Sequence, residues 1–171
     1  MNLYIIRHAI AVESDAPGYE DDSQRPLTDK GASKMVSITR GLKTLGVRFD
    51  LVIASPYLRS QETARILLKV LDLEKEQLVS SENLLPMGFP DQLIGEINEK
   101  YINLDSIAIV GHEPNLSALI SLLVARDATV SVNMKKGGVC YLSAENLRHE
   151  RRANLEWLMM PKHLVALAER D

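Results

Sequence analysis

The sequence is poor in the features that mark several classes of protein. It holds a single cysteine, Cys140, in 171 residues, so no intramolecular disulfide can form and a reducing compartment is expected. Cys140 stands in an apolar, strand-like run, which favours a buried structural thiol over a nucleophile. No stretch reaches the roughly 18 apolar residues of a membrane span, and no signal-peptide pattern opens the chain. These absences predict a cytoplasmic protein without membrane association.

A large charge of one sign is absent as well. Twenty Lys and Arg side chains stand against 23 Asp and Glu, which leaves a net charge of −3. Proteins that bind nucleic acid are usually basic, so this balance argues against that class. Hydrophobic residues make up 46% of the chain and charged residues 25%, the proportions of an ordinary globular protein. The length predicts a single domain over residues 1–171.

Short apolar runs alternate with amphipathic stretches along the chain. Six strands are expected, at residues 3–6, 51–54, 107–110, 129–134, 138–142 and 155–160. Helical segments follow the first three strands, and a last short helix closes the sequence. This alternation predicts an α/β fold, a single three-layer domain with a mostly parallel central sheet and helices on both faces. The short connection between the last two strands predicts at least one antiparallel edge strand.

The expected helices carry recognisable start and stop signals. Thr28 suits the N-cap of the first helix, and Gly46 suits its end. Its apolar stripe consists of Met35, Ile38, Leu42 and Leu45. Ser55 and Pro56 suit the N-cap and first position of the second helix. Pro114 and Pro161 open the third and the last.

Arginine and histidine follow each of the first three strands. Arg7 and His8 come directly after the first, Arg59 belongs to the segment after the second, and His112 follows the third. The carboxyl ends of parallel strands meet at one rim, where α/β proteins bind their ligands. Each residue taken alone could be structural. Together, two guanidinium groups and two imidazoles would form a set of hydrogen-bond donors suited to a phosphate dianion.

Other basic residues allow more than one reading. Arg25 ends a polar, acid-rich segment at residues 13–25, expected to be a surface loop, and it either adds to the phosphate site or neutralises the acids before it. Lys135 and Lys136 precede two glycines, which favours a turn into a strand over a phosphate cradle. The basic run at 148–152 favours a solvated hairpin turn over a contact with an acidic partner.

Four segments in order resemble one known family. They are Arg7-His8-Ala9, then Arg25-Pro26-Leu27-Thr28 with Gly31, then Ser55-Pro56 with Arg59, Gln61 and Thr63-Ala64, and then Gly111-His112-Glu113-Pro114. These segments resemble the histidine phosphatase (phosphoglycerate-mutase-like) superfamily, and more closely its SixA-type phosphohistidine phosphatases. The resemblance runs from residue 3 to about residue 119, and residues 157–164 are similar to the closing strand and helix of that subfamily.

The resemblance implies a role for each residue of the cluster. His8 would attack phosphorus and carry the phosphoryl group until water removes it, while Arg7, Arg59 and His112 would bind the phosphoryl oxygens. His8 must then be neutral, which neighbouring arginine charge favours. No metal and no other cofactor is expected, because side chains already supply the positive charge.

The choice of substrate depends on a proton donor. Relatives that cleave phosphoesters place a glutamate in the middle segment to protonate the leaving alkoxide, whereas residues 84–91 of this chain offer only Asp91. SixA-type proteins are similar in lacking that glutamate. The expected substrate is therefore phosphohistidine on a protein, such as a phosphotransfer domain. A phosphatase for a small phosphoester metabolite with Asp91 as acid, and a phosphate-binding module without catalysis, are the alternatives.

Overall fold

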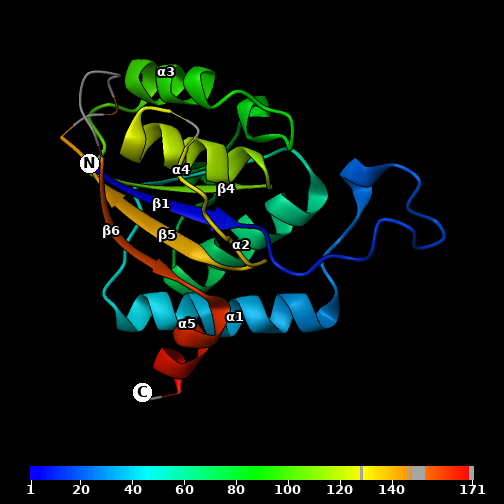
Figure 1. The fold of residues 1–171 in the computed structure, drawn as a ribbon. Coiled ribbons are helices and arrows are strands. Elements are labelled where there is room, and N and C mark those ends of the chain that lie inside the picture. The colour runs from blue at the N-terminus through cyan, green and yellow to red at the C-terminus, as the bar shows by residue number, and fades with distance from the viewer. Residues whose placement is uncertain (128, 146, 148–152, 170–171) are drawn as a thin grey trace.

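A six-stranded sheet runs through the part of the chain that the computed structural model describes, residues 1–127, 129–145, 147 and 153–169. The strands lie in the order β3-β2-β4-β1-β5-β6, and Figure 1 labels the last four of them. Their bounds are β1 (Asn2–Arg7), β2 (Leu51–Ala54), β3 (Leu78–Ser80), β4 (Ser106–Gly111), β5 (Val139–Ser143) and β6 (Asn154–Met159). The first four pair in parallel, and β5 runs antiparallel to both β1 and β6. The predicted α/β class and the antiparallel pairing at one edge are confirmed.

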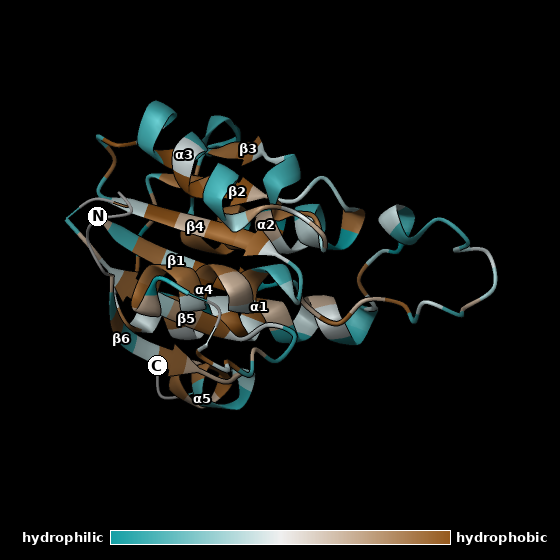
Figure 2. Cartoon of the chain, turned by 45° about the horizontal axis from the view of Figure 1, so that its top comes forward, coloured by the Kyte–Doolittle hydropathy of each residue, from teal (hydrophilic) through white to brown (hydrophobic). Residues whose placement is uncertain are grey.

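Helices cover both faces of this sheet (Figure 1). One face is covered by α1 (Asp29–Thr44), α2 (Leu58–Leu71) and α5 (Pro161–Ala168), and the other by α3 (Pro90–Lys100) and α4 (Asn115–Ala125). Alternate residues of β1 serve the two cores: Leu3 and Ile5 pack toward α3 and α4, and Tyr4 and Ile6 toward α1 and α2. Figure 2 shows the matching pattern, apolar central strands between helices with hydrophilic outer faces.

Helix α1 follows its sequence signals closely. The Thr28 hydroxyl accepts a hydrogen bond from the Gly31 amide at 3.0 Å, and Gly46 adopts a φ of +73° just beyond the end of the helix. Of the expected stripe, Met35, Ile38 and Leu42 are buried. Leu45 was wrongly placed in it: the helix ends at Thr44, and Leu45 is 41% exposed.

The strand expected at residues 129–134 does not form. Side chains from elsewhere occupy the backbone groups that a strand would offer to a neighbour. The Val130 amide donates to the Ser121 hydroxyl, the Val132 carbonyl accepts from the Ser117 hydroxyl, and the Met134 carbonyl accepts from Arg7. The segment is therefore fixed as an irregular connection that passes the active site.

The start of α2 also differs from the expectation. The helix begins at Leu58 with Tyr57 as its N-cap, so Ser55 and Pro56 lie before it. Ser55 instead accepts a hydrogen bond from the Tyr57 amide at 3.3 Å and is fully buried. The short strand β3 was not foreseen, because only three residues pair there with β2.

Two further expectations concern single segments. Cys140 is buried in β5, as expected, and its burial raises the pKa of the thiol to about 12. The basic run at 148–152 lies outside the described residues. No helix among the described residues has both the length and the apolar character needed to span a bilayer.

Candidate active site

The carboxyl ends of β1 and β4 lie side by side and carry two of the expected residues. Arg7 ends β1 opposite Gly111, the last residue of β4, and His112 follows directly. The His8 amide donates to the Gly111 carbonyl at 3.1 Å, which extends the strand pairing by one residue. The Gly137 amide donates to the carbonyls of both Arg7 and His8, at 3.0 and 3.1 Å. The backbone of this pair is thus held from two sides.

His8 is held in a single tautomer. Its Nδ1 lies 2.7 Å from the Ala9 carbonyl, and because a carbonyl can only accept, Nδ1 must carry the proton. The lone pair of Nε2 is then free for a reaction. Burial lowers the pKa of His8 to about 3, and the charges of Arg59, Arg7 and Lys136 push in the same direction. His8 is therefore a neutral imidazole at physiological pH.

His112 faces His8 across the site. The two ring centroids are 5.0 Å apart, and the His112 Nε2 lies 2.9 Å from the Ser55 hydroxyl and 3.2 Å from the Ser60 hydroxyl. Burial, together with the charges of His8 and Arg59, lowers the pKa of His112 to about 2. When Nε2 accepts from the serines, Nδ1 carries the proton, and it is a buried donor without a partner among the described residues.

The two arginines are positioned by backbone and ring contacts. One terminal nitrogen of Arg7 donates to the Met134 carbonyl at 2.7 Å. Arg59 stands in the first turn of α2 with its side chain only 4% exposed. Its guanidinium lies 4.9 Å from the centroid of the Tyr57 ring, and that ring lies 5.1 Å from the His112 ring. Tyr57 therefore links Arg59 to His112 by a cation–π and an edge-to-face contact.

Three buried nitrogens of this cluster have no hydrogen-bond partner in the part of the chain that the structure describes. They are Nε of Arg7, Nε of Arg59 and Nδ1 of His112. Leaving a buried donor unpaired costs about 1–3 kcal/mol, so natural structures rarely leave several together without a purpose. A bound oxyanion would supply acceptors to donors of this kind.

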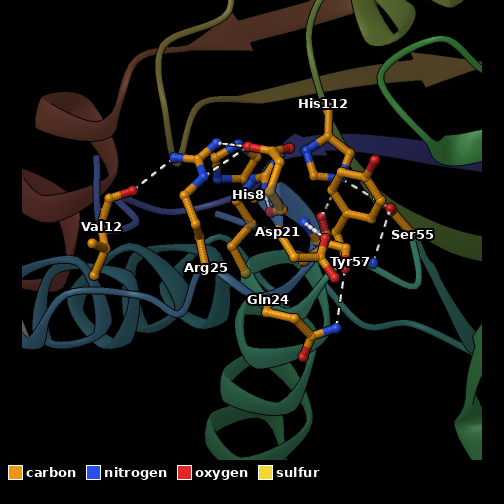
Figure 3. Close-up of polar contacts among 12 residues, drawn as sticks. His8, Val12, Asp21, Gln24, Arg25, Ser55, Tyr57 and His112 are labelled. Carbon is orange, nitrogen blue, oxygen red and sulfur yellow. Dashed lines mark hydrogen bonds and ion pairs between the residues drawn. The ribbon is translucent and has the colours of Figure 1, made fainter. Parts of the chain in front are cut away.

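A carboxylate from the 13–25 loop reaches the same cluster. Asp22 accepts from both terminal nitrogens of Arg59, through its carbonyl at 2.6 Å and its carboxylate at 2.9 Å. The same carboxylate pairs with Arg25, whose other terminal nitrogen donates to the Val12 carbonyl at 2.7 Å (Figure 3). Burial alone would raise the pKa of Asp22, but the hydrogen bonds from Arg59 and Arg25 hold it below its usual range. Arg25 thus pairs with an acid of its own loop, which is one of the two expectations for it, and its role toward a phosphate stays a prediction.

The structure brings four of the six expected residues together directly: Arg7, His8, Arg59 and His112. Arg25 joins them through Asp22, and Asp91 lies exposed in the first turn of α3. The contacts described for His8 are with Ala9, Gly111, Gly137 and His112, so the acid role of Asp91 stays a prediction from sequence.

Sequence reasoning missed three side chains of the site: Asp22, Tyr57 and Ser60. Only Tyr57 left a usable signal, since an aromatic residue between a strand end and Arg59 is well placed to cover a guanidinium. Asp22 is one of several acids in its loop, and nothing in the sequence sets it apart. Among the described residues, no group of three or more His, Cys, Asp and Glu side chains could hold a metal ion.

Solved structures share this fold along nearly the whole chain. The protein histidine phosphatase SixA, solved in complex with tungstate, superposes with a TM-score of 0.81 at 22% identity and covers 96% of this chain and 99% of its own. The α-ribazole phosphatase from Shigella flexneri superposes with a TM-score of 0.72 at 21% identity, covering 94% and 97%. At these identities the likeness concerns the fold.

Proteins of similar sequence were found as well. An uncharacterised protein from Picosynechococcus is 29% identical over 96% of this chain and 99% of its own. The mitochondrial serine/threonine-protein phosphatase Pgam5 of Drosophila simulans is 35% identical over 79 residues, which span 46% of this chain and 26% of that protein. Residues 3–84, which hold Arg7, His8, Arg25 and Arg59, match the model of the histidine phosphatase superfamily (branch 1).

An α/β sheet whose strand ends gather two arginines and two neutral histidines defines a phosphate-handling protein. The model of the histidine phosphatase superfamily matches residues 3–84 of this chain, and the fold of the solved structures extends along nearly all of it. This similarity supports phosphatase activity and leaves the substrate open, because proteins of similar fold act on different phosphates.

Proposed function

We propose that this protein is a metal-independent phosphatase that hydrolyses phosphohistidine on another protein through a phosphorylated His8. One observation carries the proposal: His8 is neutral, with its proton held on Nδ1 by the Ala9 carbonyl and its Nε2 lone pair free among cationic side chains. A module that only bound phosphate would have no need of a nucleophile arranged in this way.

The reaction takes two displacements. The His8 Nε2 attacks phosphorus while the bond between phosphorus and the substrate imidazole breaks, and that imidazole, which carries a proton on its other ring nitrogen, leaves as a neutral molecule with the electron pair of the broken bond. Water then attacks the phosphorus on His8, the electron pair of the broken bond returns to Nε2, and inorganic phosphate leaves with the protons of the water. Arg7, Arg59 and His112 hold the phosphoryl oxygens in both steps and stabilise the negative charge on them.

The choice of phosphohistidine rests on the leaving group and on access. An imidazole departs without the strong proton donor that an alkoxide requires, so the reaction needs no acid beside His8. The chain between β3 and β4 has room for one short helix, α3, which packs on α4 at one face of the sheet. So short a segment leaves little chain for a lid over a small substrate, which favours a histidine displayed on a protein surface. The similarity to SixA, solved as a protein histidine phosphatase, supports the same choice.

The alternative is a phosphatase for a small phosphoester metabolite with Asp91 as the acid. The fold shared with an α-ribazole phosphatase favours it. Asp91 stands exposed in the first turn of α3, whereas His8 is buried directly after β1. A comparison of substrates separates the two proposals.

The test uses purified protein and its His8→Ala variant. We expect hydrolysis of an aryl phosphate, and faster dephosphorylation of a phosphotransfer domain phosphorylated on histidine than of sugar phosphates. His8→Ala should abolish turnover and the acid-labile phosphoenzyme. A preference for sugar phosphates that is lost in Asp91→Asn would favour the alternative, and phosphate binding without hydrolysis would favour a non-catalytic module.

A further inference from the structure

A groove with a concentration of positive charge opens beside the active site. It has a volume of about 650 Å³ and is lined by Arg7 of the site and four lysines: Lys34 of α1, Lys135 and Lys136 of the turn before β5, and Lys162 of α5. Four of the nine lysines in the sequence thus line one groove of a chain whose net charge is −3. We call it the lysine groove.

The turn that carries two of these lysines is fixed to the nucleophile. The Gly137 amide donates to the carbonyls of Arg7 and His8 at 3.0 and 3.1 Å. Gly137 has a φ of +80°, and a Cβ there would lie 2.8 Å from Cδ1 of Ile38, so glycine is required at this point. The charge of Lys136 is near enough to His8 to contribute to the lowering of its pKa. The lysine groove therefore continues directly from the catalytic cluster.

Among the described residues, no acid forms a salt bridge with a lysine of the groove. The salt bridges that the described residues form use Lys43, Lys100, Arg25 and Arg59, and none of the groove lysines. Lys34, Lys135 and Lys162 are exposed, and their ammonium groups surround an apolar lining from Ile10, Met160 and Pro161. Like charges held near one another repel, so an arrangement of this kind is favourable when an anionic partner binds.

We propose that the lysine groove docks an acidic segment of the protein whose phosphohistidine is hydrolysed at His8. The inference rests on the proposed function and extends it to the surface of the substrate. Arg7 and the four lysines of the groove carry more positive charge than the dianion of one phosphohistidine would neutralise. Carboxylates beside the phosphorylated histidine would pair with the groove lysines and orient the substrate. The local positive charge would also offset the repulsion between an acidic substrate and a protein of negative net charge.

The test compares two double variants with the same loss of charge. Lys34→Gln with Lys162→Gln changes the groove, and Lys69→Gln with Lys75→Gln changes two exposed lysines in and beyond the last turn of α2. The substrates are a phosphotransfer domain with carboxylates next to its phosphorylated histidine, the same domain with those carboxylates replaced by amides, free phosphohistidine and an aryl phosphate. Each substrate is assayed at low and at high salt.

We expect the groove variant to lose roughly fivefold in kcat/KM on the acidic domain at low salt, since two exposed ion pairs are removed. The loss should shrink at high salt and disappear on the amide form, on free phosphohistidine and in the control variant. An equal loss on free phosphohistidine would overturn the inference, because the groove would then act on the catalytic cluster itself.

Other outcomes separate this inference from the function on which it rests. Normal activity of the groove variant on the acidic domain overturns the docking surface and leaves the phosphohistidine phosphatase standing. If the unmodified protein hydrolyses the aryl phosphate and not the phosphorylated domain, the proposed function is wrong. The proposal that the groove binds an acidic segment of that substrate is then wrong as well.

Discussion

Among single residues, one carboxylate of the protein itself contacts the arginines of the site. The Asp22 carboxylate lies on Arg59 and Arg25, where an anionic ligand would gain most from their charge. Arg59 is buried, and burial lowers its pKa while Asp22 opposes that effect. Asp22 thus stabilises the charge of a buried arginine when the site holds no ligand, and it competes for that arginine when a phosphate arrives.

This competition predicts the effect of Asp22→Asn. Removing the negative charge should tighten the binding of inorganic phosphate roughly three- to tenfold, because Arg59 no longer shares its charge with a carboxylate. Inhibition of aryl phosphate hydrolysis by added phosphate measures it. Asp21→Asn is the matched control: that side chain accepts from the Ser23 amide at 2.9 Å, a role that asparagine keeps. Weaker phosphate inhibition in Asp22→Asn would mean that Asp22 holds Arg59 in its binding position instead.

A second prediction concerns Tyr57, whose ring positions Arg59 and His112. Its ring touches both Arg59 and His112, at centroid distances of 4.9 and 5.1 Å. Tyr57→Phe keeps both contacts and should leave kcat/KM within about twofold. Tyr57→Leu removes the aromatic face and should lower kcat/KM about tenfold, since a cation–π contact is worth roughly 1 kcal/mol and the arginine is freed to move. Equal activity of the two variants would exclude a positioning role for the ring.

At the scale of elements, α1 depends on close approach to its neighbours. A Cβ on Gly41 would lie 2.0 Å from the carbonyl oxygen of Leu164 in α5, and one on Gly31 would lie 2.0 Å from that of Ile10. Two glycines thus let α1 pack directly on the α5 backbone and on the segment that follows His8. The position of Lys34 beside Lys162 depends on the same packing.

The α1 contact predicts opposite results for two helical glycines. Gly41→Ala should lower the free energy of unfolding by about 1–3 kcal/mol, because the added methyl group meets a backbone carbonyl that cannot give way. Gly95→Ala in α3 meets nothing within 4 Å and should raise stability by up to about 1 kcal/mol through helix propensity. Urea unfolding of both variants measures the difference. A neutral Gly41→Ala would show that α1 and α5 can separate without cost.

The elements differ in how far the sequence could predict them. Strands β1, β2 and β4 are apolar runs buried on both faces, and α1 has a cap at each end, so local pattern and burial agree. Residues 129–134 have the composition of a strand, but Ser117, Ser121 and Arg7 take their backbone groups, and the sequence does not show this competition. The order of the strand ends predicted the meeting of Arg7, His8, Arg59 and His112. The contact of Asp22 with Arg59 depends on the path of a loop. A loop has no hydrophobic periodicity from which its path could be predicted.

At the scale of the whole molecule, a net charge of −3 conceals an uneven distribution. Positive charge gathers at the carboxyl ends of the strands and in the adjoining lysine groove, while the imidazoles of His8 and His112 stay neutral among these cations. Because these imidazoles can take up protons in the unfolded chain but not in the fold, the stability of the fold depends on pH.

This linkage predicts that stability falls with acidity in a window set by the two histidines. In the unfolded chain an imidazole takes up a proton below about pH 6.5, whereas in the fold the pKa of His8 is about 3 and that of His112 about 2. Between these limits the unfolded chain binds more protons, so the free energy of unfolding rises with pH and is lost as the pH falls from 6.5 toward 3.

Urea unfolding at pH 7.5 and pH 4.5 measures the effect, with His8→Asn and His112→Asn as variants. Each variant should lose less stability than the unmodified protein on acidification, by on the order of 2 kcal/mol, because one buried neutral imidazole is gone. Carboxylates such as Asp22 and Glu96, whose pKa values are lowered in the fold, weaken all forms alike at pH 4.5 and cancel in the comparison. His163→Asn, at an exposed position of α5, controls for the loss of a histidine as such. If both site variants followed the pH dependence of the unmodified protein, His8 and His112 would be protonated in the native state at pH 4.5, and His8 could not serve there as a nucleophile.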